Sequence, residues 1–162
     1  MTVSVNFVPD TAAEHAPEVA PLVELLQALR QVRIELGEDV IIVGVGARAT
    51  AAEQLARVAG AAAVRRIGPS GLADAEARSA DVVVLASDDA QLLGGALRLA
   101  RNLGRVLLLD PLGPIDFDVY PDLHKRSIRM VSAPSPAAAD ETTVAFARHL
   151  LESGQVARHG PA

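Results

Sequence analysis

The chain has 162 residues, of which 50 % are hydrophobic and only 2 % aromatic, and it carries a formal net charge of −5. This length is enough for one domain with a core of its own, and the scattered basic residues exclude a basic stripe for nucleic acid. The absence of cysteine excludes disulfides, thiol catalysis and cysteine-ligated zinc, and no apolar run reaches the roughly 20 residues that cross a bilayer. The N-terminus lacks the basic-then-apolar order of a signal peptide, so we expect a cytoplasmic protein.

The first half of the chain predicts helices that alternate with strands. Leucines recur at the spacing of one helix face before Val32, and an uninterrupted apolar run follows, as in a buried strand. The predicted elements are a polar lead-in over 1–16, a helix opened by Pro17 and Pro21 and ended by Gly37, a strand over 40–45, a helix over 50–58 closed by Gly60, and a strand over 62–67.

The second half continues this alternation. Its predicted elements are a short helix from 72 to Arg78, a strand over 81–86, a helix over 91–103 ended by Gly104, a strand over 105–109, a loop over 111–114, a strand through Ile128 and Met130, a helix over 137–153 and a frayed tail over 155–162. Alternating strands and helices predict an α/β fold with a doubly wound parallel sheet. We expect one domain over 1–162.

A glycine motif lies between the first long strand and the helix after it. It reads Gly44-x-Gly46-x-x-Ala49. In a dinucleotide-binding loop the first glycine makes the tight turn, the second lets a pyrophosphate approach the backbone, and a small third residue permits close helix–strand packing. The helix N-terminus adds free N–H groups for the anion. The motif therefore predicts a Rossmann-like cofactor site at Gly44, Gly46 and Ala49.

The sequence resembles the cofactor domain of the medium-chain alcohol-dehydrogenase-like reductases beyond this motif. The segment RIELGEDVIIVGVGARATAAEQLARVAGA is similar to the first strand–helix unit of that family. The segments ADVVVLASDDAQLLGGALRLARNLGRVLLLDPLGP, DLHKRSIRMVSAP and VAFARHLLESGQV are similar to its fourth and fifth strands, its sixth strand and its closing helix. The resemblance covers nearly the whole chain.

The resemblance also implies what this sequence lacks. In the family, a GroES-like domain and a return segment carry the zinc ligands and the substrate pocket, and we find no region that matches them. The chain has no cysteine, and its four histidines show no ligand spacing, so we expect no metal site and no zinc alcohol dehydrogenase activity. The segment from Gly68 to Asp81 is too short for the family's next strand and helix. We expect a sheet shortened by that edge unit, in the order 2-1-4-5-6 of the family's numbering.

The end of the second strand departs from the family pattern. Gly68 stands where an acidic residue would hold the ribose hydroxyl, a substitution that in the family accompanies preference for NADP. Ser70, with Arg65 or Arg66, would then accept the 2′-phosphate. The alternative is that adenosine recognition has been lost.

Three further departures from the family pattern place charged groups at the nicotinamide end of the expected crevice. Arg48 replaces an aliphatic residue of the loop and is suited to an anionic group, or is simply solvated. Asp88 and Asp110 follow two strand ends, where a pair of carboxylates is suited to acid–base work. Alternatively, Asp88 or Asp89 caps the next helix, and Asp110 is a loop residue. His124 lies in the loop before the last strand, where we expect it near the mouth of the crevice. It is suited to act as an acid or base near neutral pH, but we favour the alternative that it is a solvated loop histidine.

Three functions follow from these departures. The first is a repurposed domain that needs no cofactor and acts on a small organic molecule by non-redox acid–base chemistry, as a cyclase, isomerase or lyase of specialised metabolism, through Asp110, Asp88, Arg48 and His124. The alternative is an NADP(H)-binding oxidoreductase or the cofactor subunit of one. The third is a non-catalytic interaction module. In each case we expect a homodimer paired through the last strand, Ser127 to Ala133, as the family resemblance implies.

Overall fold

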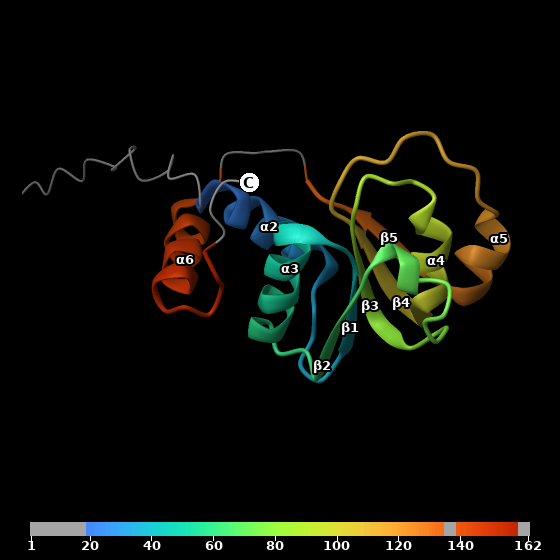
Figure 1. The fold of residues 1–162 in the computed structure, drawn as a ribbon, viewed down its shortest axis with the longest axis horizontal. Coiled ribbons are helices and arrows are strands. Elements are labelled where there is room, and N and C mark those ends of the chain that lie inside the picture. The colour runs from blue at the N-terminus through green and yellow to red at the C-terminus, as the bar shows by residue number, and fades with distance from the viewer. Residues whose placement is uncertain (1–18, 135–138, 159–162) are drawn as a thin grey trace, which may run out of the picture.

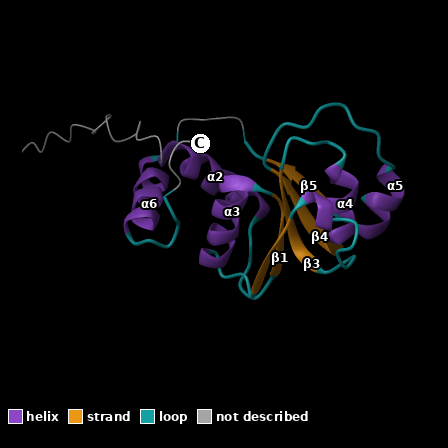
Figure 2. Ribbon diagram, in the orientation of Figure 1, coloured by secondary structure: helices purple, strands orange, loops and turns teal. Residues whose placement is uncertain are grey.

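Five parallel strands form one sheet at the centre of the molecule, in the order β2-β1-β3-β4-β5 (Figure 2). The computed structural model describes residues 19–134 and 139–158. The strands are β1 (Asp39–Gly44), β2 (Ala63–Ile67), β3 (Ala80–Ala86), β4 (Ala100–Leu108) and β5 (Arg129–Ser132). The chain moves outward from β1 to β2 and then returns to β3 on the other side of β1. This order confirms the predicted doubly wound α/β sheet, shortened by one edge unit.

Helices cover both faces of the sheet (Figure 1). On one side lie α2 (Val19–Val32) and α3 (Gly46–Val58), with α6 (Glu141–Glu152) packed against α2; on the other lie α4 (Leu92–Leu99) and α5 (Val119–Asp122). The short 3₁₀ turns are η1 (Pro69–Gly71) and η2 (His124–Arg126). No helix in the described residues is long and apolar enough to span a membrane.

The central strands are buried on both faces, which is why they read as uninterrupted apolar runs. In β1, Val40 and Ile42 face the α2–α3 side, whereas Ile41 and Val43 face the α4 side, and none of the four is more than 1 % exposed. Burying each such side chain stabilises the fold by about 1.5–3 kcal/mol. The sheet is thus a rigid base for the loops at its ends.

Several predicted helix boundaries were wrong. α2 ends at Val32 because Arg33 adopts a left-handed φ of 52°, and Gly37 lies in the following turn instead. α3 begins at Gly46, four residues before the predicted start. α6 begins at Glu141 rather than at 137, because the carboxylate of Asp140 accepts the N–H of Thr143 at 2.7 Å and caps the helix. The predicted lead-in and the end of the predicted tail lie outside the described residues.

Two further predictions around α4 were wrong. The helix predicted up to Arg78 is absent. The Arg98 guanidinium instead donates to the carbonyl oxygens of Leu72, Ala73 and Ala75, which holds this segment as an irregular chain. α4 ends at Leu99 rather than at 103, because Ala100 already pairs with β3 and starts β4 through a register irregularity.

An ion-pair network lies at the amino edge of the sheet, where the strands begin. Arg101 donates to the carboxylates of Asp39 at 2.6 Å and Asp81 at 2.9 Å, and Arg105 pairs with Glu38. Burial raises the pKa of Asp81, but the hydrogen bonds from the Asp39 N–H and from Arg101 outweigh burial and hold that pKa below its ordinary value. The charges of this edge therefore satisfy one another.

Candidate functional site

The glycine loop connects β1 to α3 at the carboxyl edge of the sheet, where the strands end. Gly44 has a φ of +145°, and a Cβ there would lie 2.3 Å from the carbonyl oxygen of Ala86 on β3. Gly46 has a φ of +85°, but a Cβ there would meet no atom within 4 Å. The first glycine thus lets two strands approach closely, whereas the second leaves open space over the backbone.

The first turn of α3 faces this open space with its backbone N–H groups unused by any side-chain cap. Val45 occupies the N-cap position and provides no capping hydrogen bond. Ala49, at the third motif position, is fully buried and allows α3 to pack closely on the sheet. These N–H groups and the positive end of the helix dipole suit an anion at the loop.

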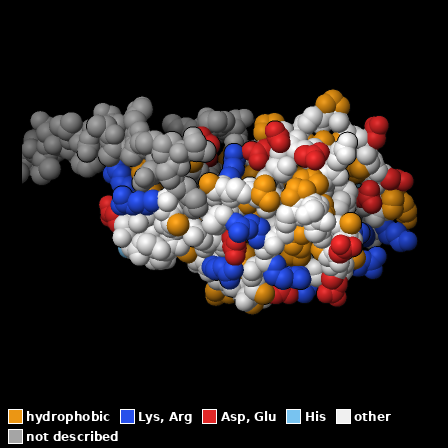
Figure 3. All heavy atoms as spheres, in the orientation of Figure 1, with side chains coloured by type: hydrophobic (Ala, Val, Ile, Leu, Met, Phe, Trp, Pro, Cys, Tyr) orange, Lys and Arg blue, Asp and Glu red, His pale blue; other side chains and the backbone are white. Residues whose placement is uncertain are grey.

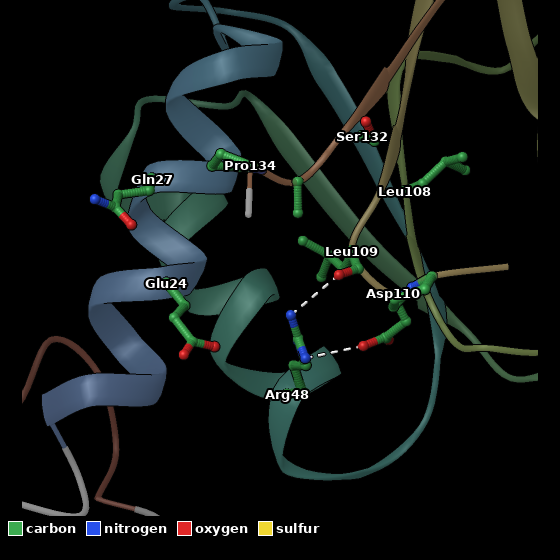
Figure 4. A pocket seen from close by; sticks show the side chains of 10 residues that line it. Glu24, Gln27, Arg48, Leu108, Leu109, Asp110, Ser132 and Pro134 are labelled. Atoms are coloured by element: carbon green, nitrogen blue, oxygen red, sulfur yellow. Dashed lines mark hydrogen bonds and ion pairs between the residues drawn. The ribbon is translucent and has the colours of Figure 1, made fainter. Parts of the chain in front are cut away.

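A groove of about 410 Å³ continues from the glycine loop toward β5. It lies between α2, the first turn of α3 and the ends of β4 and β5 (Figure 4). Its lining residues are Glu24, Gln27, Arg48, Leu108, Leu109, Asp110, Pro111, Ser132, Ala133 and Pro134. The groove therefore combines an aliphatic floor with charged groups at its rim.

Arg48 and Asp110 meet in this groove. Nη1 of Arg48 lies 2.9 Å from Oδ1 of Asp110, and Nη2 donates to the carbonyl oxygen of Leu109 at 3.1 Å. Glu24, on α2, lines the same groove (Figure 4). Two of the four predicted catalytic residues are thus brought together, although their charges are already paired.

The end of β2 lies beside the glycine loop. A Cβ on Gly68 would lie 3.5 Å from Cγ1 of Val45, and Ser70 follows in η1 with its side chain exposed. Arg65 is exposed as well, and the register places it on the α4 face of the sheet, opposite to Arg66. Ser70 and Arg65 are therefore available to a ligand that extends from the loop toward β2.

Arg66 is engaged with α3, which sequence reasoning missed. Its guanidinium donates to Oγ1 of Thr50 and lies 3.7 Å from the carboxylate of Glu53. The Thr50 hydroxyl in turn donates to the carbonyl oxygen of Gly46 at 3.1 Å. Arg66 thus helps to fix the position of the glycine loop through Thr50. The spacing of Thr50 and Glu53 on one helix face was the only signal available in the sequence.

The structure does not bring Asp88 and His124 into the groove. Asp88 is exposed and does not line it, while the neighbouring Asp89 accepts the N–H of Gln91 at 2.9 Å before α4. The expected position of His124 near the crevice was wrong. Because η2 precedes β5, and all strands run parallel, His124 lies at the amino edge, opposite the groove.

Within residues 19–134 and 139–158, no three histidine or acidic side chains form a group that could hold a metal ion. The fold and the glycine loop together define a Rossmann-like α/β domain.

Comparisons with known proteins agree with this class. No protein-family model matches the chain, and no curated protein matches its sequence. A proposed zinc-binding dehydrogenase from Sinorhizobium meliloti 1021, solved bound to NADP, matches 86 % of this chain with a TM-score of 0.74 and 22 % identity. An alcohol dehydrogenase from Thermus sp. ATN1 matches 88 % with a TM-score of 0.63 and 20 % identity, and L-idonate 5-dehydrogenase from Escherichia coli matches 85 % with a TM-score of 0.70 and 17 % identity.

These likenesses show the fold alone. The matched regions are 48 %, 51 % and 45 % of the three dehydrogenases, so the chain spans about half the length of each.

Proposed function

We propose that this domain binds NADP(H) as the nucleotide-binding part of an oxidoreductase. The observation that carries the proposal is the glycine loop, with open space above Gly46 and an uncapped first turn of α3. A pyrophosphate in that space would accept hydrogen bonds from the free N–H groups and lie at the positive end of the helix dipole. The fold shared with a dehydrogenase solved bound to NADP supports this assignment.

The end of β2 favours NADP(H) over NAD(H). An acidic side chain at this position would hold the ribose 2′-hydroxyl and repel a 2′-phosphate, and Gly68 offers none. Ser70 and Arg65, both exposed, would hold the phosphate by a hydroxyl and a guanidinium. Bound NADPH would supply a hydride to a carbonyl substrate; the role of the residues named here is to bind and orient the cofactor.

The non-redox hypothesis has less support. It rested on Asp88 and Asp110 facing one crevice, whereas Asp88 does not line the groove and Asp110 is paired with Arg48. The predicted repulsion between Asp88 and Asp110, which would separate two pKa values, is therefore absent from the groove. We therefore favour the NADP(H)-binding oxidoreductase over the non-redox enzyme.

Calorimetric titration of the purified chain with NADPH and NADH tests the proposal. We expect NADPH to bind, and to bind about tenfold more tightly than NADH, which corresponds to about 1.4 kcal/mol. Arg65→Gln should remove this preference, whereas Arg148→Gln, on α6 and outside both the groove and the β2 end, should retain it. Failure of both nucleotides to bind at millimolar concentration would reject the proposal and favour a non-catalytic module.

We also propose that the chain forms a homodimer through β5. This strand is the last in the sheet, and its residues Arg129, Met130 and Ser132 are exposed. An edge strand with an unpaired backbone is a template for a second strand. Light scattering should give twice the chain mass of 16.9 kDa, and Met130→Glu should shift the species toward monomer. A monomeric parent protein would contradict this assembly.

A further inference from the structure

The crevice at the carboxyl edge has two sides, divided by the glycine loop. In a doubly wound sheet a dinucleotide lies across the switch point, with its pyrophosphate at the helix N-terminus and its adenosine ribose at the end of the second strand. The switch point of this sheet lies between β1 and β3. Adenosine would therefore lie on the β2 side, and the nicotinamide half would extend over β3 toward β4.

The side chain of Arg48 lies across the β4 side of the crevice. Its backbone belongs to the first turn of α3, yet its guanidinium reaches Leu109 and Asp110 just beyond β4 (Figure 4). Because β3 lies between β1 and β4, this side chain crosses the carboxyl end of β3. The path toward β4 is thus taken by a side chain of the protein itself.

The polar groups at the end of β4 are also occupied. The carbonyl oxygen of Leu109 and the carboxylate of Asp110 already accept hydrogen bonds from Arg48. A nicotinamide group that took the place of the guanidinium would have to break these contacts, and would then leave the guanidinium to be solvated elsewhere. By contrast, Ser70 and Arg65 on the β2 side are exposed.

The pair is held loosely enough to open without unfolding the domain. The side chain of Arg48 is 45 % exposed and that of Asp110 is 22 % exposed. Neither belongs to the apolar core, so their separation does not require the core to unfold.

We propose that the Arg48–Asp110 pair competes with the nicotinamide half of the nucleotide for the β4 side of the crevice, so that the adenosine diphosphate half provides most of the affinity. This inference rests on the proposed function and specifies which part of the cofactor the chain binds. The nicotinamide half binds only when the pair opens, so it contributes almost nothing to affinity. Arg48 is the specificity-determining residue, and Asp110 holds it in place.

The test compares NADPH with 2′-phospho-ADP-ribose, which lacks only the nicotinamide, by calorimetry. For the parent chain we expect the two dissociation constants to agree within about threefold. Arg48→Leu should leave the constant of the fragment unchanged and make NADPH bind about tenfold more tightly than the fragment. Asp110→Asn should act in the same direction with a smaller gain, because it removes the ion pair but retains the bond to Leu109.

Arg148→Leu, outside the groove, is the matched control and should behave as the parent chain. Thermal unfolding of each variant reports whether the fold is kept. A parent chain that already binds NADPH tenfold more tightly than the fragment would overturn the inference while supporting the proposed function, as would unchanged ratios in both groove variants. Absence of binding by both ligands to every variant would overturn the proposed function and the inference together.

Discussion

The two edges of the sheet use charge in opposite ways. At the amino edge, Arg101 pairs with Asp39 and Asp81, and Arg105 pairs with Glu38, so each of these charges lies next to one of opposite sign. At the carboxyl edge, the glycine loop leaves backbone N–H groups free of any side-chain cap, beside a groove of about 410 Å³. Side chains thus pair with one another at the amino edge, whereas the carboxyl edge, at which ligands bind in such sheets, keeps its backbone donors available.

The Arg48–Asp110 pair is the exception that makes this comparison informative. Arg48 and Asp110 form an ion pair at the carboxyl edge, as the charged side chains at the amino edge do. The charged groups on the β4 side of the glycine loop are therefore paired with each other, whereas Ser70 and Arg65 on the β2 side are exposed.

The largest effect on stability should come from Gly44→Ala, which disrupts the close contact between β1 and β3. Its Cβ would meet the Ala86 carbonyl oxygen at 2.3 Å, and neither backbone can move without separating the two central strands. We expect the free energy of unfolding to fall by about 3 kcal/mol. Urea denaturation measures this change. A loss below about 1 kcal/mol would mean that the strands can part without cost.

Gly46→Ala is the matched substitution at the carboxyl edge. Its Cβ would meet no protein atom, so only the left-handed backbone conformation is penalised, at about 1–2 kcal/mol. The methyl group would nevertheless occupy the space assigned to the pyrophosphate. We expect NADPH affinity to fall more than tenfold while the chain stays folded, which calorimetry on the folded variant measures. Retained affinity would remove the loop from the nucleotide site.

The smallest effect should come from Asp81→Asn at the amino edge. The folded-state pKa of Asp81 lies below its ordinary value of 3.8, so the ionised carboxylate stabilises the fold above that value and loses this contribution as the pH falls through the lowered pKa. We expect a loss of about 1 kcal/mol at pH 7, after allowance for solvent screening.

The parent chain and Asp81→Asn should differ in stability at pH 7 and approach equal stability at an acid pH below the lowered pKa, where the parent carboxyl is protonated as well. Denaturation midpoints at the two pH values measure the difference. Asp116→Asn, at an exposed loop position, should show no loss at either pH. A loss for Asp81→Asn that is independent of pH would assign the effect to packing rather than to charge.

Much of the fold could be predicted because its signals are local. The apolar run over 40–45 predicts a buried strand, and the glycine motif marks the turn after it. The start of α3 was missed because Gly46 to Ala49 carries no apolar periodicity. The segment before Arg78 has good helix formers, but its conformation depends on Arg98, a distant partner that composition does not reveal.

The candidate site was only partly predictable for the same reason. Arg48 and Asp110 were each visible as departures from the family resemblance, but their ion pair depends on how β1, β3 and β4 are ordered. The position of His124 was misjudged even though parallel strands fix it, since a loop that precedes a strand must lie at the amino edge. The order of the strands therefore carries more information about the site than the residue types do.

The contacts of Arg98 have a consequence for how the molecule moves. One guanidinium serves the carbonyl oxygens of Leu72, Ala73 and Ala75, at 2.6, 3.1 and 2.8 Å. A single side-chain excursion therefore releases three acceptors at once, so the segment should open as one cooperative unit rather than fray residue by residue. Amide hydrogen exchange at Leu72 and Arg78, whose N–H groups donate to the carbonyl oxygens of Pro69 and Arg98, should accordingly share one opening free energy, well below that of the central strands.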